Sequence, residues 1–415
     1  MKRRKHSFVL GVGALVLIGT LLTFSLPQMV IAADFALKDL AGNIHFGPVR
    51  LHPYFSVQGF YTDNMFLEHT NEKEDWKLVY IPGITVQVPF HKKRHLFQFD
   101  YRAEIIRHED FSNYDMENHR ASALFKFRFP WGLDLTVGDE FIKSATWPDY
   151  EGDTLDDYFY NDAKIEGVYK LGERYRLKMH YENVIKEFPD WTILDSYMRN
   201  EVAIDLYYRF LPKTNVMVEY KIFYHDNDDR QYLSTDNLNN HIWVGLAWEP
   251  GARLKGEIKG GFVSRQYAEY GRNENTIGMK ADLTYFLGNY TSFRLEATRE
   301  IIATEITDED VFYGTHFIRT GGALSVKYMF PFLSHGYHKI SAIAKGFYYD
   351  DEYREKGMYA NRRHDNQYGG SAEIDLEIWE RLGFKVMYRY IDNDSNFKVE
   401  DYREHRFMGQ ISLTL

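Results

Sequence analysis

The feature that most constrains this chain is a two-residue alternation of apolar and polar side chains, which recurs from residue 51 almost to residue 415. Between Phe97 and Ile105, for example, every second residue is apolar and the residues between them are polar or charged. A period of two indicates β-strands with one apolar face. About eighteen such runs occur, each of roughly ten to fourteen residues, which is long enough for a tilted strand to cross a bilayer.

The connections between these runs alternate between short and long. The short ones fall at residues 91–94, 130–132, 171–174, 211–214, 250–252, 287–289, 332–337 and 380–383. Longer polar connections include residues 62–75, 148–157, 226–239, 304–315 and 350–366. The pattern predicts an all-β fold: a single transmembrane antiparallel up-and-down β-barrel of about eighteen strands, with short periplasmic turns and long extracellular loops. A β-propeller has a similar period, but its blades hold four short strands where this chain has two long ones.

The N-terminal residues have the composition of a secretory signal. Four basic residues, Lys2 to Lys5, precede an apolar run from Phe8 to Leu26, and small residues follow at Ala32 and Ala33. We therefore predict a signal peptide over residues 1–33, a periplasmic N-terminal segment over 34–50 and the barrel over 51–415. An uncleaved anchor is the alternative. The predicted location is the bacterial outer membrane.

Composition excludes several classes of function. Without the predicted leader the chain has 46 basic and 60 acidic residues, a net charge of −14, which argues against nucleic acid as a partner. The absence of cysteine excludes disulfides, thiolate metal sites and a lipidated cysteine. Aromatic residues make up 17% of the chain, and two aromatic girdles facing lipid would account for them. A polar lumen is consistent with a mean hydropathy of −0.47.

The polar face of the predicted strands supplies the candidate site. It carries charges of both signs, and the residues expected to line the lumen are Arg102, Glu104, Arg128, Glu140, Lys164, Glu166, Arg176, Glu182, Arg209, Glu219, Lys255, Glu257, Arg294, Glu296, Glu373 and Arg389. They suit either a hydrated conduit that hydrogen-bonds a polar solute or a structural network of ion pairs. Tyr54, Tyr207, Trp243 and Tyr349 are candidates to stack on sugar rings, although they could also serve only as packing.

Catalytic motifs are lacking in the sequence. No nucleophile-elbow pattern or phosphate-binding loop occurs, so we expect no enzyme, no cofactor and no resident metal. Acidic clusters on long connections, such as Asp350 to Glu352 and Asp392 to Asp394, suit solvated surface loops, with calcium binding as the alternative.

The first strands also show a family likeness. Tyr54 to Val57, Tyr61 to Asn64, Ile81 to Gly83 and Phe99 to Ala103 together resemble the outer-membrane β-barrel porin family that accompanies exopolysaccharide and capsule export loci. The resemblance implies a barrel of about eighteen strands that works with a periplasmic polysaccharide-export protein to pass a polysaccharide outward.

Outer-membrane lipid and the barrel-assembly machinery are the other expected partners. That machinery commonly reads a terminal aromatic residue, and this chain ends on Leu415 with Phe407 nearby. The leading hypothesis is a conduit for exopolysaccharide or capsular polysaccharide. A general diffusion porin, a surface adhesion or structural barrel, and an outer-membrane hydrolase are the alternatives.

Overall fold

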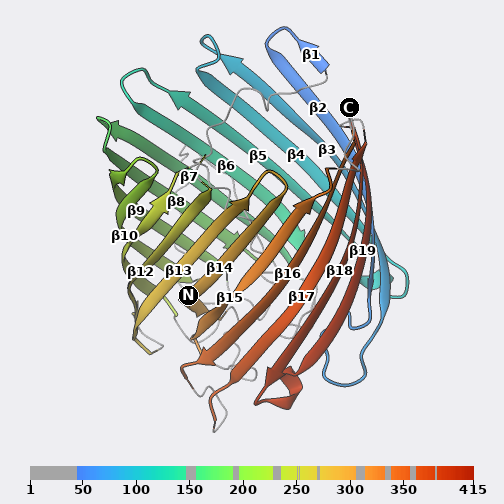
Figure 1. Cartoon of the computed structure of the whole chain (residues 1–415). Helices are drawn as coiled ribbons and strands as arrows, with labels where there is room; N and C mark the ends of the chain where they lie inside the picture. The colour runs from blue at the N-terminus through green and yellow to red at the C-terminus, as the bar shows by residue number, and fades with distance from the viewer. Residues whose placement is uncertain are drawn as a thin grey trace, which may run out of the picture.

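The chain folds into a closed β-barrel (Figure 1). The computed structural model describes residues 44–145, 156–189, 196–227, 235–249, 251, 253–268, 272–304, 314–331, 338–355, 361–378 and 381–415. Within these residues, β2 to β19 are eighteen consecutive antiparallel strands, and β19 pairs with β2. The predicted signal peptide over 1–33 lies outside the described residues. Among those residues, no helix is long and apolar enough to span a membrane.

The eighteen barrel strands are 12 to 16 residues long. Their bounds are β2 Val49–Thr62, β3 Asp75–Phe90, β4 His95–His108, β5 Met116–Arg128, β6 Leu133–Ala145, β7 Asp157–Leu171, β8 Tyr175–Glu187, β9 Tyr197–Leu211, β10 Thr214–Asn227, β11 Asn237–Trp248, β12 Leu254–Tyr267, β13 Glu274–Leu287, β14 Thr291–Ala303, β15 His316–Met329, β16 His338–Tyr353, β17 His364–Ile378, β18 Leu382–Ser395 and β19 Tyr402–Thr414. Two single-turn 3₁₀ helices, η2 (Ser112–Tyr114) and η3 (Lys398–Glu400), lie in connections.

The first and last strands close the barrel. Their register runs from Tyr54 opposite Thr414 to Thr62 opposite Arg406. Closure gives each of these barrel strands a paired neighbour on both sides, as a lipid environment requires. The prediction of an all-β antiparallel barrel of about eighteen strands is confirmed.

One short strand precedes the barrel. β1 (Ile44–Phe46) turns back onto the start of β2 through Gly47, whose φ of +60° suits a tight hairpin turn. Part of the predicted N-terminal segment is therefore paired with the barrel wall. β2 itself begins at Val49, two residues before the predicted start of the barrel.

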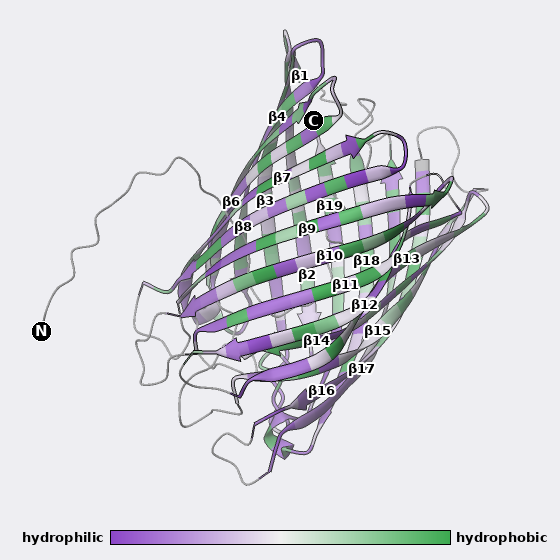
Figure 2. Ribbon diagram, turned by 90° about the vertical axis from the view of Figure 1, so that its left-hand side faces the viewer, coloured by the Kyte–Doolittle hydropathy of each residue, from purple (hydrophilic) through white to green (hydrophobic). Residues whose placement is uncertain are grey.

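Hydrophobic and hydrophilic residues alternate along the strands (Figure 2). Large apolar side chains such as Leu206, Val218 and Phe407 are exposed on the outside of the barrel. Near the short turns, Trp131 stacks on Phe129 and contacts Tyr169. Aromatic rings at this level match a girdle at the periplasmic membrane interface.

Candidate functional site: the barrel lumen

The cross-strand register sorts the side chains of the wall into two faces. Leu206 lies opposite Leu177 and Val218, and 47% of its surface is exposed. Its chain neighbour Asp205 lies opposite Lys178 and Glu219 and is buried. Because an apolar outer face contacts lipid, the face that carries the charges lines the lumen.

Most of the predicted lumen residues lie on this inner face and form ion pairs there. Arg102 is 3.0 Å from Glu104, and Arg294 is 3.3 Å from Glu296. Other predicted residues have partners that the sequence analysis did not single out: Glu140 pairs with Arg120, Glu166 with Lys178, Arg209 with Glu249, Glu219 and Glu257 with Lys259, and Glu296 with Lys345. Alternation alone assigns these partners to the same face, but it does not say which charges meet.

Three predicted arginines have different surroundings. Arg128 lies at the periplasmic end of β5, exposed, with its Nε 3.6 Å from Asp134. Arg176 stacks on the ring of Tyr207, 4.1 Å from its centroid. Arg389 is buried on β18, in register with Arg406 of β19.

Ion pairs are densest on the inner faces of β7 to β10, which we call the charged wall. The carboxylate of Glu182 accepts from Lys164 at 2.9 Å and from Arg199 at 2.7 Å. Glu201, which lies opposite Glu182 on β9, pairs with Lys221 at 2.7 Å. These contacts join four successive strands, so they hold the side chains in place as well as neutralise them.

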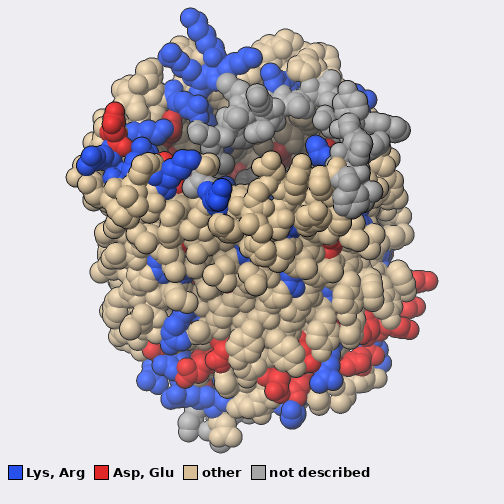
Figure 3. Space-filling view, in the orientation of Figure 1, with Lys and Arg blue, Asp and Glu red and all other residues tan. Residues whose placement is uncertain are grey.

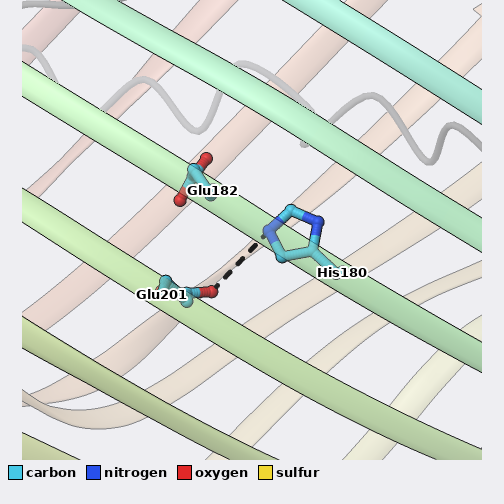
Figure 4. Close-up of side chains that lie close together, drawn as sticks. All are labelled: His180, Glu182 and Glu201. Carbon is cyan, nitrogen blue, oxygen red and sulfur yellow. Dashed lines mark ion pairs between the residues drawn. The ribbon is translucent and has the colours of Figure 1, made fainter. Parts of the chain in front are cut away.

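One group on the charged wall has the residue types of a metal site. His180, Glu182 and Glu201 bring one ligand atom each to within 4.8 Å of one another (Figure 4). The three cations that already pair with the two carboxylates would repel a divalent ion and compete with it. The group is therefore better described as part of the ion-pair network.

Another part of the lumen has a different chemistry, and we call it the neutral wall. It comprises the inner faces of β19, β2 and β3 toward the periplasm. The members are Ser56, Gln58, Thr85, Gln87, Gln410 and Ser412. Gln58 donates to Gln410 at 3.0 Å, and Gln87 donates to Gln98 of β4 at 3.1 Å. Each amide offers two donors and an acceptor with two lone pairs, so one such bond leaves capacity for a solute.

The predicted stacking aromatics are placed unequally. Tyr54 lies flat over Gly83, where a Cβ would come within 2.2 Å of the ring, so this position requires glycine. The guanidinium of Arg319 lies over the ring of Tyr349, 5.3 Å from the ring centroid. Trp243 is 1% exposed and is covered by other side chains, so it offers no free face to a solute in this conformation.

The two ends of the barrel differ in their balance of exposed charge: basic side chains predominate at the upper end of Figure 3, and acidic and basic side chains are mixed at the lower end. At the short turns, basic side chains are exposed: Lys92, Lys93, Arg94, Lys170, Arg174, Lys213, Arg253 and Arg381. At the long connections, exposed acidic side chains include Glu68, Glu72, Glu74, Glu109, Asp110 and Asp394. At the basic end, burial alone would raise the pKa of Glu249, but hydrogen bonds from Arg209 and Asn215 outweigh it and hold that pKa below its usual value.

Comparison with protein families decides which kind of barrel this is. Residues 200–415, more than half of the chain, match the family described as "Putative beta-barrel porin 2". The chain belongs to this family. It is therefore an outer-membrane β-barrel porin, a channel rather than an enzyme, as the sequence predicted.

Several solved bacterial structures are similar to this chain at low sequence identity. OccAB4 of Acinetobacter baumannii is 13% identical, with 88% of this chain and 98% of that chain covered and a TM-score of 0.50. OpdL of Pseudomonas aeruginosa is 14% identical, with 89% and 100% covered and a TM-score of 0.49. OpdK of the same species, solved with vanillate, is 10% identical, with 88% and 99% covered and a TM-score of 0.47. No curated protein matches the chain.

Proposed function

We propose that this porin exports an acidic exopolysaccharide or capsular polysaccharide from the periplasm, together with a periplasmic export protein. The observation that carries the proposal is the difference in charge between the two mouths. Exposed lysine and arginine side chains predominate at the periplasmic end, whereas at the extracellular end exposed carboxylates lie among exposed basic residues such as Arg107 and Arg403. A basic mouth raises the local concentration of a polyanion on the side from which export begins, and acidic groups outside disfavour its return.

The lumen suits such a polymer in two ways. Cations such as Arg102, Arg176 and Arg294 lower the cost of bringing carboxylates into a confined channel, and the carboxylates beside them prevent tight trapping. The neutral wall offers amide and hydroxyl groups to sugar hydroxyls near the periplasmic mouth, with the ring of Tyr54 alongside them. The resemblance of the first three strands to barrels of polysaccharide export loci supports the same assignment.

The proposal extends to the N-terminal residues. We assign residues 1–33 as a signal peptide removed during secretion and residues 34–50 as a periplasmic segment available to the export protein. The pairing of β1 with β2 anchors the end of this segment at the periplasmic rim. N-terminal sequencing of the protein purified from outer membranes should begin at Asp34.

The proposal is tested by removing charge from the periplasmic rim. A triple variant, K92Q/K93Q/R94Q, should lower the amount of acidic polysaccharide on the cell surface several-fold and shift the ion selectivity of the channel in planar bilayers toward cations. A matched variant of the extracellular side, K398Q/R403Q, removes two exposed cations and should leave export intact. Equal export by both variants at equal levels of folded barrel would refute the proposal.

A general diffusion porin is the second candidate, because the acidic extracellular mouth would attract cationic solutes from outside. Uptake assays with proteoliposomes separate the two. Rapid uptake of small cationic solutes, combined with unchanged surface polysaccharide in a deletion strain, would favour the diffusion porin.

A further inference from the structure

The extracellular end of β14 separates from its neighbour β13, whereas β15 stays paired with β14 on one side and with β16 as far as Phe317 on the other. β14 pairs with β13 no further than Arg299, which lies opposite Met279. Beyond that point, residues 300–303 pair with β15 alone, and residues 274–278 of β13 pair with β12 alone. β14 also contacts β12, although β13 separates these strands elsewhere. We call the two strand ends, residues 300–303 and 316–318, the tip.

The burial of two isoleucines shows in which direction the tip bends. Alternation places Ile301 and Ile318 on the outer face, yet they are only 8% and 1% exposed. Both belong to one cluster with Trp243 and Val263, which are inner-face residues of β11 and β12. An outer face can pack against the inner wall only if the tip has folded into the lumen, so the tip covers part of the extracellular mouth.

The tip packs onto a surface formed by the neighbouring strands β11, β12 and β13, which we call the seat. The indole of Trp243 extends along the wall as far as Gly278 on β13, where a Cβ would come within 2.4 Å of the ring. The missing side chain lets the indole lie flat beneath the tip. A flat aromatic surface of this kind gives an apolar contact without interlocking side chains, which suits a contact that forms and separates.

Polar contacts around the seat hold the tip in place. Arg265 donates to the backbone oxygen of Ile301 at 3.5 Å, and the Tyr267 hydroxyl donates to that of Thr315 at 3.3 Å. The ring of His316 stacks on Tyr267, with 5.7 Å between centroids. On the other side, a carboxylate oxygen of Glu274 on β13 lies 3.8 Å from Nε2 of His316 in the tip. The same carboxylate accepts from Arg354, just beyond the end of β16, at 3.0 Å.

A glycine pair lies where the tip joins the wall. Gly321 and Gly322 face Thr298 and Ala297, just below the last residue of β14 that pairs with β13. At either glycine a Cβ would lie 2.2 Å from a backbone oxygen of a neighbouring strand. Glycine in a strand marks a bend or a close approach of two backbones, and this pair allows the strand ends to turn inward.

We propose that the tip is a gate at the extracellular mouth. It bends at Gly321 and Gly322 together with the end of β16 that stays paired with it, closes onto Trp243 and is latched by Arg265, Tyr267 and Glu274. Movement of the tip back into line with β13 enlarges the passage and restores the strand pairing that β13 and β14 lack above Met279 and Arg299. The gate acts on any solute, so it is independent of the proposal for polysaccharide.

Engineered cysteines test the gate directly, because the chain has none of its own. The variant Y267C/H316C places two thiols where the stacked rings meet, and a short bifunctional methanethiosulfonate reagent joins them. In planar bilayers the linked channel should stay at its low conductance level, and reduction should restore the high level. The control, Y220C/N240C, links two outer-face side chains of β10 and β11 that already touch, at 3.0 Å, and should gate normally.

A second variant tests the gate without cross-linking. R265Q/E274Q weakens the latch and should raise the ratio of open to closed time by roughly fivefold. If mass spectrometry confirms the link in Y267C/H316C and the high level persists, the tip is a fixed part of the wall and the proposal is overturned. An unchanged open fraction in R265Q/E274Q would also contradict it.

Discussion

The charged wall and the neutral wall share one backbone architecture but have opposite side-chain chemistry. On the charged wall, Glu182 and Glu201 are held by lysine and arginine from neighbouring strands, which leaves little freedom for their side chains. On the neutral wall, Gln58 and Gln410 make a single cross-strand bond and keep further donors and acceptors. Their outer faces are equally apolar. An apolar outer face is enough to build both parts of the barrel wall. The inner side chains can therefore differ between the two walls and suit different contacts with a solute.

The largest expected effect comes from breaking the charged wall at its centre. Glu182→Ala removes the carboxylate that pairs with Arg199 and one of the two that pair with Lys164, which keeps Asp162. The variant should lower the free energy of unfolding by about 3 kcal/mol, because Arg199 loses its paired carboxylate in a confined space. Urea unfolding of the barrel in phospholipid vesicles measures the change. Gln410→Ala on the neutral wall should cost about 1 kcal/mol. Equal costs would remove the distinction between the walls.

The outer faces of the two walls should respond alike. Ile204→Arg on β9 and Val57→Arg on β2 each place a charge toward lipid near the middle of a strand. Each should lower the free energy of unfolding by roughly 2–4 kcal/mol. The same unfolding assay applies. A loss confined to one of the two variants would show that the other face is covered by something other than lipid.

The cross-strand pairs of the two walls should also differ in their coupling energies. Glu219 and Lys259 pair at 2.6 Å with both side chains about nine-tenths buried, and a double-mutant cycle with alanine should give a coupling of about 1–3 kcal/mol. The amide pair Gln58 and Gln410, at 3.0 Å, should give about 0.5 kcal/mol. A reversed order would mean that the amides, not the charges, stabilise the lumen.

The smallest effect is expected outside the lumen. Lys398 pairs with Asp401 at 2.5 Å on the extracellular surface, where the lysine is exposed to solvent. Lys398→Ala should leave the unfolding midpoint unchanged, because solvent screens such pairs. Lys221→Ala, which removes the partner of Glu201, should lower the midpoint in the same assay. A clear loss in the Lys398 variant would assign the extracellular loop a structural role.

Much of the candidate site follows from alternation. Residues such as Arg102, Glu219 and Arg294 could be placed on the polar face of a strand because the face depends on only the nearest residues along the chain. The pairing of charges could not be predicted in this way. Glu296 meets Lys345 from two strands away, and that contact depends on the register of every strand between them.

Trp243 shows where alternation is insufficient. It lies on the inner face, but the tip of β14 and β15 covers it, so its position leaves no free ring face for stacking on a solute. Ile301 and Ile318 have the pattern of lipid-facing residues and instead pack inside the lumen. The alternation of apolar and polar residues within β14 cannot reveal that the end of this strand separates from β13.

The sequence by itself determined the two faces along most of the barrel wall and, through the alternation of short and long connections, a barrel of about eighteen strands, because these properties arise from residues close together in the chain. The tertiary structure decided which inner charges neutralise one another, where the amides gather and that one strand pair bends inward. Those features arise between strands that are distant in sequence, and they depend on how the closed wall curves and on where glycine lets it fold.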